Sequence, residues 1–423
     1  MGQRYEGVVV RLLDPTERRV PTSEIETPLV IAPRQSSAPQ FLEQFLSSHS
    51  VQLIEDIAKH GAILLRGFKI DSAAEFERQV LSIRSMHGFS NIMLMEPFRM
   101  RVNGTQHVIH TNGVYAVGGQ LRFGAFHSEN YYLPDVPRYI SFFCIKPSSL
   151  GGETGLLNTA KLFEDLPTVV RQKLEERSYV VDQTPIATIA ERYGLSEKDC
   201  ERFCVSAGLP VTSSERTKHM VICKPSVVRH PLTGERSLMI DTTELIDTLW
   251  PLLLKIYLPD YGGWRWLIHR LYWTHEWVPR FASRVRRYGR RLHRRVLLAV
   301  RGKFPKRVKA NAVLPSAELL LPRVKSAFTI EDLELVALAM RRRFSSFLWK
   351  RGDILIIDNL KMAHAGLPGR GERKLPFLLC NPVVLDYSRD ASGIQLLAKD
   401  RAQSLGEQLI VLRNNVAETG KIN

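Results

Sequence analysis

Apolar residues occur along this chain mostly as short runs, and polar turns separate them. Runs with continuous or alternating apolar positions predict strands, which we place at residues 7–12, 29–32, 62–65, 124–130, 140–145, 220–228, 237–240, 354–357 and 375–379. Apolar residues three and four positions apart predict helices, which we place at residues 40–46, 51–60, 162–177, 186–206 and 330–343. A further helix is expected behind the capping candidates Asp71 and Ser72, and it carries apolar residues from Phe76 to Ile83. This mixture of short strands, a few helices and many turns predicts a mainly β fold with helices, a β-sandwich or a jelly roll.

The composition fits a globular protein with a substantial core, because 44% of the 423 residues are hydrophobic. No apolar run approaches the roughly 20 residues that span a bilayer. The N-terminus has no apolar core of a secretory signal, and Glu6 stands where a myristoylation signal needs Ser or Thr. We therefore expect a cytoplasmic protein.

The cysteines form no CxxC pair, which disfavours a disulfide framework and a zinc ribbon. Their number is odd, and they are scattered: Cys144, Cys200, Cys204, Cys223 and Cys380. Cys200 and Cys204 lie one helical turn apart, but without a partner pair they are better explained as buried thiols than as metal ligands.

The net charge of +16 is concentrated in one segment. Residues 264–309 contain 15 Arg and Lys and one acid, Glu276, so this segment alone carries +14. The rest of the chain is nearly neutral, and the basic segment is therefore a local feature.

A histidine and a glutamate stand two residues apart in the stretch from Phe126 to Tyr132. In a strand, His127 and Glu129 point to the same face. An imidazole and a carboxylate side by side can hold two positions of a metal ion, and a second histidine completes the facial triad of non-haem Fe(II) oxygenases. His-x-Glu alone is a weak signal, but the aromatic surroundings strengthen it.

The candidate for the second histidine is His364, which we place in a short loop after an apolar strand and an Asp-Asn turn. Nine residues later, Arg373 stands at the expected start of the next strand. The planar guanidinium of an arginine binds a carboxylate bidentately, as a dicarboxylate co-substrate such as 2-oxoglutarate requires. Thr154, in the run Gly-Gly-Glu-Thr, is a candidate hydroxyl donor to the same carboxylate.

With these motifs in order, the chain resembles the TauD/TfdA group of Fe(II)/2-oxoglutarate dioxygenases, nearest to the branch with the syringomycin-pathway hydroxylase. The matching stretches cover most of residues 25–385 apart from the basic insertion, and they are residues 61–68, 126–131, 140–144, 151–154, 230–235, 349–359 and 364–373. A Rossmann fold is disfavoured, because no Gly-x-Gly-x-x-Gly run opens a helix after a strand.

The resemblance implies a double-stranded β-helix, or jelly roll, in which His127, Glu129 and His364 bind Fe(II). It also implies that 2-oxoglutarate binds this iron and pairs with Arg373, assisted by Thr154, and that O2 is the oxidant. We expect one catalytic domain over residues 1–423, with a Trp- and Arg-rich helical insertion at 259–325 and a C-terminal extension at 388–423 that is partly helical.

The presence of Glu129 refines the expected reaction. Family members that halogenate lack this carboxylate ligand, so its presence favours hydroxylation or a related C–H oxidation.

The role of some other residues stays open. The loop after His364 departs from the pattern of the branch, so Arg370 is either a second anion contact or an exposed loop residue. His107 and His110 are candidates to reach the substrate, whereas His230 is better explained as a structural hydrogen-bonding residue in a turn.

Three interpretations of the basic segment stay open. Residues 280–296 have apolar positions at helical spacing among arginines, which suits a solvated helix packed on the barrel. The same residues suit docking to an acidic partner such as a carrier-protein domain, or attachment to an anionic membrane surface. Nucleic acid is disfavoured, because no recognition motif accompanies the arginines.

We therefore expect an oxygenase that hydroxylates a small, amino-acid-like substrate, free or carrier-tethered, while 2-oxoglutarate is converted to succinate. The alternative is a non-catalytic binding protein on the same fold that works through its basic insertion.

Overall fold

The structure is a computed structural model, and it describes residues 5–22, 24–89, 101–111, 119–120, 123–175, 178–214, 217–274, 328–390, 393–400 and 402–419. Its largest sheet has seven strands in the order β1-β2-β3-β14-β5-β17-β18, and only β2 and β3 pair in parallel. These strands are β1 (Val8–Arg11), β2 (Leu29–Pro33), β3 (Ala62–Leu65), β14 (Ile354–Asp358), β5 (Val136–Phe143), β17 (Phe377–Asp390) and β18 (Gly393–Asp400).

A second sheet faces the first and has the order β13-β7-β15. Its strands are β13 (Phe344–Phe347), β7 (Thr154–Asn158) and β15 (Met362–Gly366). Smaller sheets are β4-β16-β6, β11-β12 and β8-β10-β9, built from β4 (Gly119–Gln120), β16 (Gly369–Arg370), β6 (Leu150–Gly151), β11 (Val227–Arg229), β12 (Arg236–Leu238), β8 (Ser178–Pro185), β10 (Thr217–Pro225) and β9 (Val211–Ser214).

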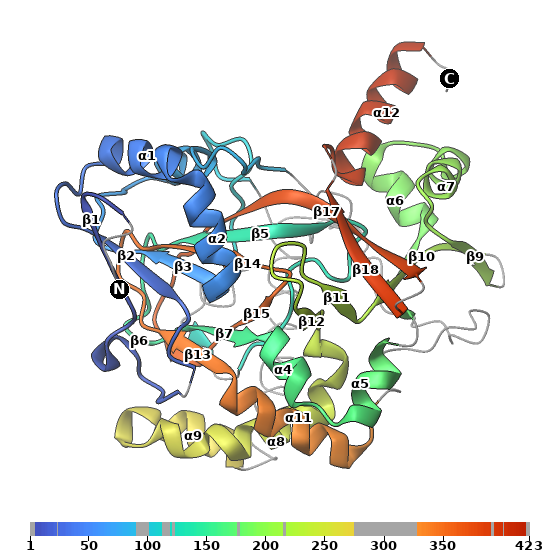
Figure 1. Cartoon of the computed structure of the whole chain (residues 1–423). Helices are drawn as coiled ribbons and strands as arrows, with labels where there is room; N and C mark the ends of the chain where they lie inside the picture. The colour runs from blue at the N-terminus through green and yellow to red at the C-terminus, as the bar shows by residue number, and fades with distance from the viewer. Residues whose placement is uncertain are drawn as a thin grey trace, which may run out of the picture.

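Helices cover both outer faces of this pair of sheets (Figure 1). On the large sheet lie α1 (Pro39–Ser48), α2 (Ser50–His60) and α3 (Ala73–Leu81). On the small sheet lie α4 (Thr159–Asp165), α5 (Thr168–Glu175), α8 (Ile246–Tyr257) and α11 (Ile330–Arg342), with α9 (Leu267–Thr274) beside them. A separate cluster joins α6 (Ile186–Tyr193), α7 (Glu197–Ser206) and α12 (Leu405–Thr419). Short 3-10 turns are η1 (Pro15–Glu17), η2 (Thr242–Leu245), η3 (Leu258–Tyr261) and η4 (Trp264–Trp266).

Strand β14 shows why its sequence is continuously apolar. Ile354 and Ile356 face the helices of the large sheet. Leu355 and Ile357 face the opposite way and pack with residues of the small sheet, such as Leu156. Since both faces of the strand are buried, a run without polar alternation is what this position requires. Two facing sheets between two layers of helices confirm the predicted mainly β, jelly-roll fold.

Several predicted elements differ in the structure. Residues 124–130 form no regular strand, and only isolated bridges tie His127 to His364 and to Asp241. The predicted helix 162–177 is divided into α4 and α5, because Leu166 is extended before Pro167. Helix 186–206 is likewise divided, where Gly194 adopts a left-handed conformation. Beyond residue 389 the chain forms β18 before the helix α12.

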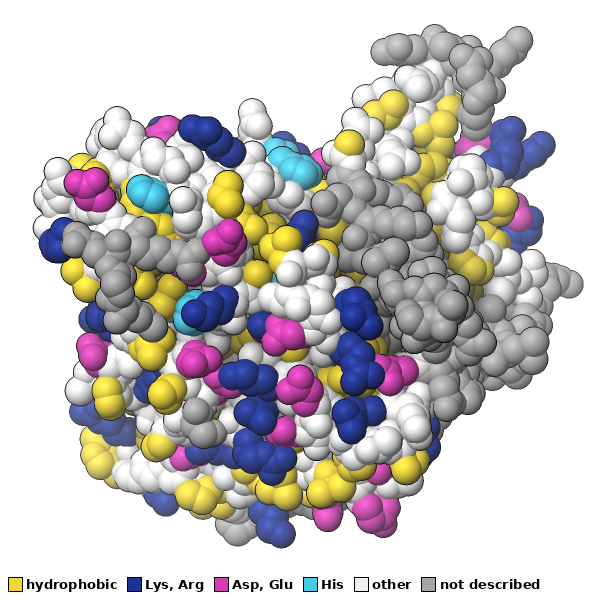
Figure 2. Space-filling model, viewed as in Figure 1, with side chains coloured by type: hydrophobic (Ala, Val, Ile, Leu, Met, Phe, Trp, Pro, Cys, Tyr) yellow, Lys and Arg dark blue, Asp and Glu magenta, His cyan; other side chains and the backbone are white. Residues whose placement is uncertain are grey.

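The described surface bears mixed charges. Figure 2 shows Lys and Arg side chains interspersed with Asp and Glu over the lower part of this face. Examples are the ion pairs of Arg236 with Glu175 at 2.7 Å and of Arg343 with Asp165 at 2.9 Å. This agrees with the near-neutral charge of the chain outside the basic segment.

The division into a catalytic domain, an insertion at 259–325 and an extension at 388–423 stays a prediction. Residues 275–325 of the insertion lie outside the described residues, and so do the predicted amphipathic helix at 280–296 and most of the basic segment. At the extension, β17 runs through residue 388 and pairs with β18 in the large sheet. No helix in the described part of the chain is long and apolar enough to cross a bilayer.

Candidate metal centre

The backbone places His127 directly opposite His364. The N–H of His127 donates to the carbonyl of His364 at 3.1 Å, and the N–H of His364 donates to the carbonyl of His127 at 3.0 Å. Residues paired in this way across antiparallel strands project their side chains to the same face. The two imidazole rings accordingly lie 4.5 Å apart, centroid to centroid. His364 therefore belongs to strand β15, and its predicted position in a loop was wrong.

The carboxylate of Glu129 lies between the two imidazoles. Its Oε2 is 3.4 Å from Nε2 of His127 and 3.5 Å from Nε2 of His364. The three side chains offer ligand atoms that all lie within 4.8 Å of one another. Two imidazole nitrogens and one carboxylate oxygen on a shared face are the donor set of a mononuclear non-haem iron site. The residues present thus fit a divalent iron ion.

Hydrogen bonds around the cluster orient its members. The Nδ1–H of His127 donates to the carbonyl of Ala125 at 2.8 Å, which directs the other ring nitrogen, Nε2, toward Glu129. Burial opposes a positive charge on His127, but the hydrogen bond and negative charge of Glu129 outweigh it and raise the pKa of this imidazole. A proton therefore competes with a cation for the same nitrogen.

Asn359 fixes the backbone that carries Glu129. Its Oδ1 accepts from the N–H of Glu129 at 2.6 Å, and its Nδ2 donates to the carbonyls of Glu129 at 3.1 Å and Pro137 at 2.8 Å. Asn359 is fully buried at the end of β14. Sequence reasoning placed this residue in a turn and missed its role, although its position directly after an apolar strand was visible.

The preceding residue, Asp358, accepts from Nε2 of His230 at 2.8 Å, and both side chains are fully buried. Nδ1 of His230 accepts from the backbone N–H of Thr233 at 3.1 Å. His230 thus links its own turn to the end of β14, as expected of a structural hydrogen-bonding residue.

Strand β7 brings Thr154 next to the strand that carries His364. In the small sheet, Thr154 pairs with Gly366 and Leu156 pairs with His364, so the side chains of Thr154 and His364 share the face toward the large sheet. The Thr154 hydroxyl accepts from Nε1 of Trp349 at 3.1 Å and keeps its own proton to donate.

The guanidinium of Arg373 hydrogen-bonds the turn that precedes Thr154. Its Nη1 donates to the carbonyls of Gly152 at 2.6 Å and Glu153 at 3.4 Å, the two residues before Thr154. Arg373 does not open a strand as predicted, because β17 begins only at Phe377. A cationic fork and a hydroxyl are thereby placed at one turn, as binding of a carboxylate requires.

The remaining candidates are Arg370, His107 and His110, and neither histidine belongs to the three-residue cluster. Arg370 is in β16, opposite Leu150, and it is partly exposed. The backbone N–H of His107 donates to the Glu77 carboxylate at 2.6 Å, and burial lowers the pKa of its imidazole. His110 is exposed. A role of His107 or His110 at the substrate stays a prediction.

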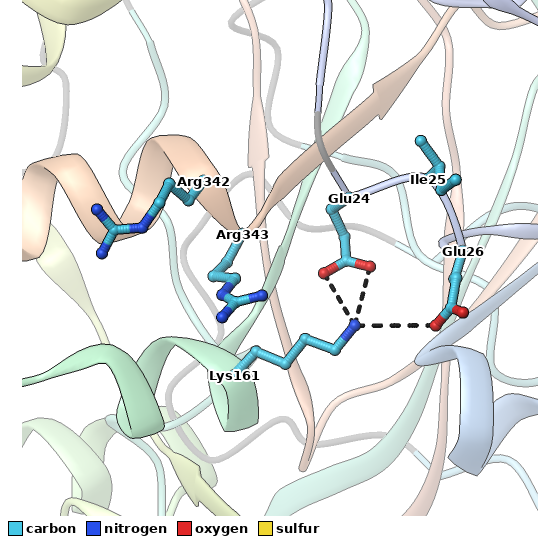
Figure 3. A pocket seen from close by; sticks show the side chains of 6 residues that line it. All are labelled: Glu24, Ile25, Glu26, Lys161, Arg342 and Arg343. Carbon is cyan, nitrogen blue, oxygen red and sulfur yellow. Dashed lines mark hydrogen bonds and ion pairs between the residues drawn. The ribbon is translucent and has the colours of Figure 1, made fainter.

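A separate hollow of about 460 Å³ is polar, and none of the three ligand side chains lines it. Figure 3 shows how Lys161 points to Glu24, at 3.2 Å, and to Glu26, at 3.8 Å, while Arg342 and Arg343 lie opposite. Asp165 binds Arg343 at 2.9 Å. Charges that are already paired within the protein give this hollow little capacity for an added ion.

Comparison with known proteins identifies the class. The family model described as "Taurine catabolism dioxygenase TauD, TfdA family" matches residues 33–260, and the chain belongs to this family. It is thus a dioxygenase, and enzymes of this family use Fe(II), 2-oxoglutarate and O2. The match includes His127, Glu129 and Thr154 and ends before His364 and Arg373.

The chain is also similar to individual known proteins. The chain is 24% identical over 359 residues to the dapdiamide synthesis protein DdaC of Enterobacter agglomerans, covering 82% of this chain and 90% of that protein. A putative alpha-ketoglutarate-dependent taurine dioxygenase from Burkholderia xenovorans has a TM-score of 0.45 at 13% identity, covering 94% of this chain and 100% of that one. PvcB, an Fe, alpha-ketoglutarate dependent oxygenase from an isonitrile synthetic pathway, has a TM-score of 0.42 at 13% identity, covering 89% and 92%.

Proposed function

We propose that this dioxygenase hydroxylates a small, amino-acid-like substrate at a centre where His127, Glu129 and His364 hold Fe(II). The observation that carries the proposal is the Glu129 carboxylate, whose Oε2 lies 3.4 and 3.5 Å from the two imidazole nitrogens. Iron bound there supplies the activation of O2 that couples decarboxylation of 2-oxoglutarate to oxidation of a substrate C–H bond.

The side chains around the centre have separate tasks. Arg373 pairs with the distal carboxylate of 2-oxoglutarate, and Thr154 donates its hydroxyl proton to the same group. Phe142 of β5 packs edge-on to the His364 ring, 5.2 Å between centroids, and shields the cluster on the side of the large sheet. Apolar walls keep water from a reactive centre, which limits side reactions. Because Glu129 occupies one ligand position, hydroxylation is favoured over halogenation.

The substrate class is supported by the relative named for dapdiamide synthesis, which covers most of this chain. We infer a substrate from specialised metabolism, either a free amino acid derivative or the same group tethered to a carrier protein. Both forms can be offered to the Fe(II)-loaded enzyme with 2-oxoglutarate. A product heavier by one oxygen atom, formed together with succinate, identifies the accepted form.

The ligand set is tested by His364→Ala. This variant should lose Fe(II)-dependent turnover of 2-oxoglutarate, because two ligands hold the ion far more weakly than three. His87→Ala is the matched control, since its side chain is exposed and its bonds to Asn381 come from the backbone. Turnover by His364→Ala at the rate of the control would refute the assignment.

For the basic segment we propose attachment to an anionic membrane surface. Its first turns expose apolar side chains in the described structure: Trp264 is 81% exposed, Ile268 54%, Leu267 48% and Leu271 43%. An apolar hollow of about 500 Å³ adjoins them. An exposed tryptophan and aliphatic side chains next to arginines suit the interface of an anionic bilayer better than bulk water. A carrier-protein partner is the competing outcome.

A further inference from the structure

Arg19 lies in the segment between β1 and β2, residues 12–28, here called the N-terminal arm. It is held between two parts of the chain that are distant in sequence. On one side its Nε donates to Oε1 of Glu153 at 2.6 Å. On the other side its guanidinium carbon lies 4.0 Å from the ring centroid of Tyr261 and 4.8 Å from that of Trp266. Its Nη1 also donates to the carbonyl of Asp260 at 3.0 Å. These contacts immobilise a side chain that on most surfaces is mobile.

Glu153 has no exposed surface, and Arg19 is the single side chain in the described structure that hydrogen-bonds its carboxylate. Burial raises the pKa of Glu153, while the charges of Arg19 and Arg373 oppose that rise. A buried carboxylate that loses its cation is strongly destabilised and must protonate or move. The position of residue 153 therefore depends on Arg19.

Glu153 also belongs to the turn that orients Arg373, the proposed binding residue for 2-oxoglutarate. The carbonyls of Gly152 and Glu153 accept from Nη1 of Arg373, and Thr154 follows directly. A shift of the Glu153 side chain would move the carbonyls that orient the Arg373 guanidinium. Groups that orient a binding residue in this way commonly alter affinity about 10- to 100-fold when they are removed.

Trp266 packs against the turn formed by residues 151–154. Gly151 has a φ of +60°, and a Cβ there would lie 2.6 Å from the Trp266 indole and 2.5 Å from the carbonyl of Pro368. The indole is thus packed directly on the backbone of the turn, next to its contact with Arg19. Trp266 and Tyr261 belong to the described first part of the predicted insertion, residues 259–274, which thus packs on the turn that precedes Thr154.

We propose that Arg19 and Glu153 are positioning residues that hold the Gly151–Thr154 turn and, through it, orient Arg373 toward 2-oxoglutarate. The inference rests on the proposed role of Arg373. It assigns to the N-terminal arm a function in co-substrate affinity, although this arm contributes no ligand to the metal.

The test is anaerobic equilibrium binding of 2-oxoglutarate to the full-length Fe(II)-loaded protein, with Fe(II) affinity measured in parallel. Arg19→Met should weaken 2-oxoglutarate binding about tenfold and leave Fe(II) affinity unchanged. Glu153→Gln keeps the shape of the side chain without a buried charge, and it should weaken binding in the same direction. In the double variant the two effects should be less than additive.

Arg236→Met is the matched control. Arg236 also makes one ion pair, with Glu175, and one ring contact, over Phe163, but it lies away from the Gly151–Thr154 turn. Arg373→Met serves as the reference for loss of the anchor itself. If Arg373→Met binds 2-oxoglutarate normally, the proposed anchor is wrong. If Arg373→Met is impaired and both Arg19→Met and Glu153→Gln match Arg236→Met, the positioning role alone is wrong.

Discussion

At the residue scale, the centre depends on three side chains and on the backbone that presents them. The two-residue spacing of His127 and Glu129 is local and could be predicted from the sequence, as could His364 from its position after an apolar strand. Asn359 could not be predicted in its role, because its partners belong to a segment 230 residues away. A hydrogen bond between distant segments leaves no periodic signal in the sequence.

Asn359→Ala tests this support. Loss of the amide leaves the buried N–H and carbonyl of Glu129 without their partner, and each unsatisfied group costs about 1–3 kcal/mol. We expect the free energy of unfolding to fall by about 2–4 kcal/mol and Fe(II) affinity to fall as well, measured by chemical denaturation and metal titration. Asn414→Ala, on the exposed surface of α12, should change neither quantity. Normal Fe(II) affinity of a folded Asn359→Ala would count against a supporting role.

At the scale of elements, a buried ion network joins the N-terminal arm to the large sheet. Arg66, after β3, binds Glu17 of η1 at 2.7 Å and Asp353, before β14, at 2.6 Å. The strands β3 and β14 could be predicted, because both are continuously apolar. The breaks in the predicted helices were also encoded locally, by Pro167 and Gly194. The network could not be predicted, because its members come from three distant turns.

This network predicts a dependence of stability on pH. Burial of Glu17 opposes its charge, but hydrogen bonds from Arg11 and Arg66 outweigh burial and lower the pKa of Glu17 to about 2. A carboxylate with a lowered pKa stabilises the fold fully above its unfolded pKa of about 4.5, and this contribution disappears as pH falls through about 2. The shift corresponds to roughly 3 kcal/mol at neutral pH.

Glu17→Gln should therefore be less stable than the wild type at neutral pH, and the difference should shrink as the pH is lowered below about 4.5. Urea unfolding over a pH series measures it. Glu372→Gln, which removes an exposed ion pair with Lys146, is the control and should show little effect at any pH. A constant difference between Glu17→Gln and the wild type across the series would contradict the network.

At the scale of the whole molecule, charge is separated along the chain. The paired, near-neutral surface of the jelly roll contrasts with the +14 of residues 264–309. The composition revealed this contrast directly. The sequence did not reveal that the first turns of the basic segment pack through Trp266 onto the Gly151–Thr154 turn, because the contact depends on the tertiary arrangement.

The proposed membrane surface predicts binding to vesicles of phosphatidylcholine with phosphatidylserine and little binding to phosphatidylcholine alone. Replacing Leu267, Ile268 and Leu271 by Ser should weaken this binding several-fold, because the apolar contribution is lost. The matched control replaces Val205 and Val411, which are exposed elsewhere, by Ser. Equal binding of both variants and the wild type would exclude this surface, and binding of an acidic carrier protein instead would favour the protein partner.

The central claim is that His127, Glu129 and His364 form an iron site that accepts 2-oxoglutarate. Its most direct test is an anaerobic titration of the wild-type protein with Fe(II) and then 2-oxoglutarate, followed by visible absorption. We expect a charge-transfer band that requires both additions, saturates at one iron per chain and is lost in His364→Ala, which lacks one imidazole ligand. Absence of the band in the wild type, or an unchanged band in His364→Ala, would contradict the account.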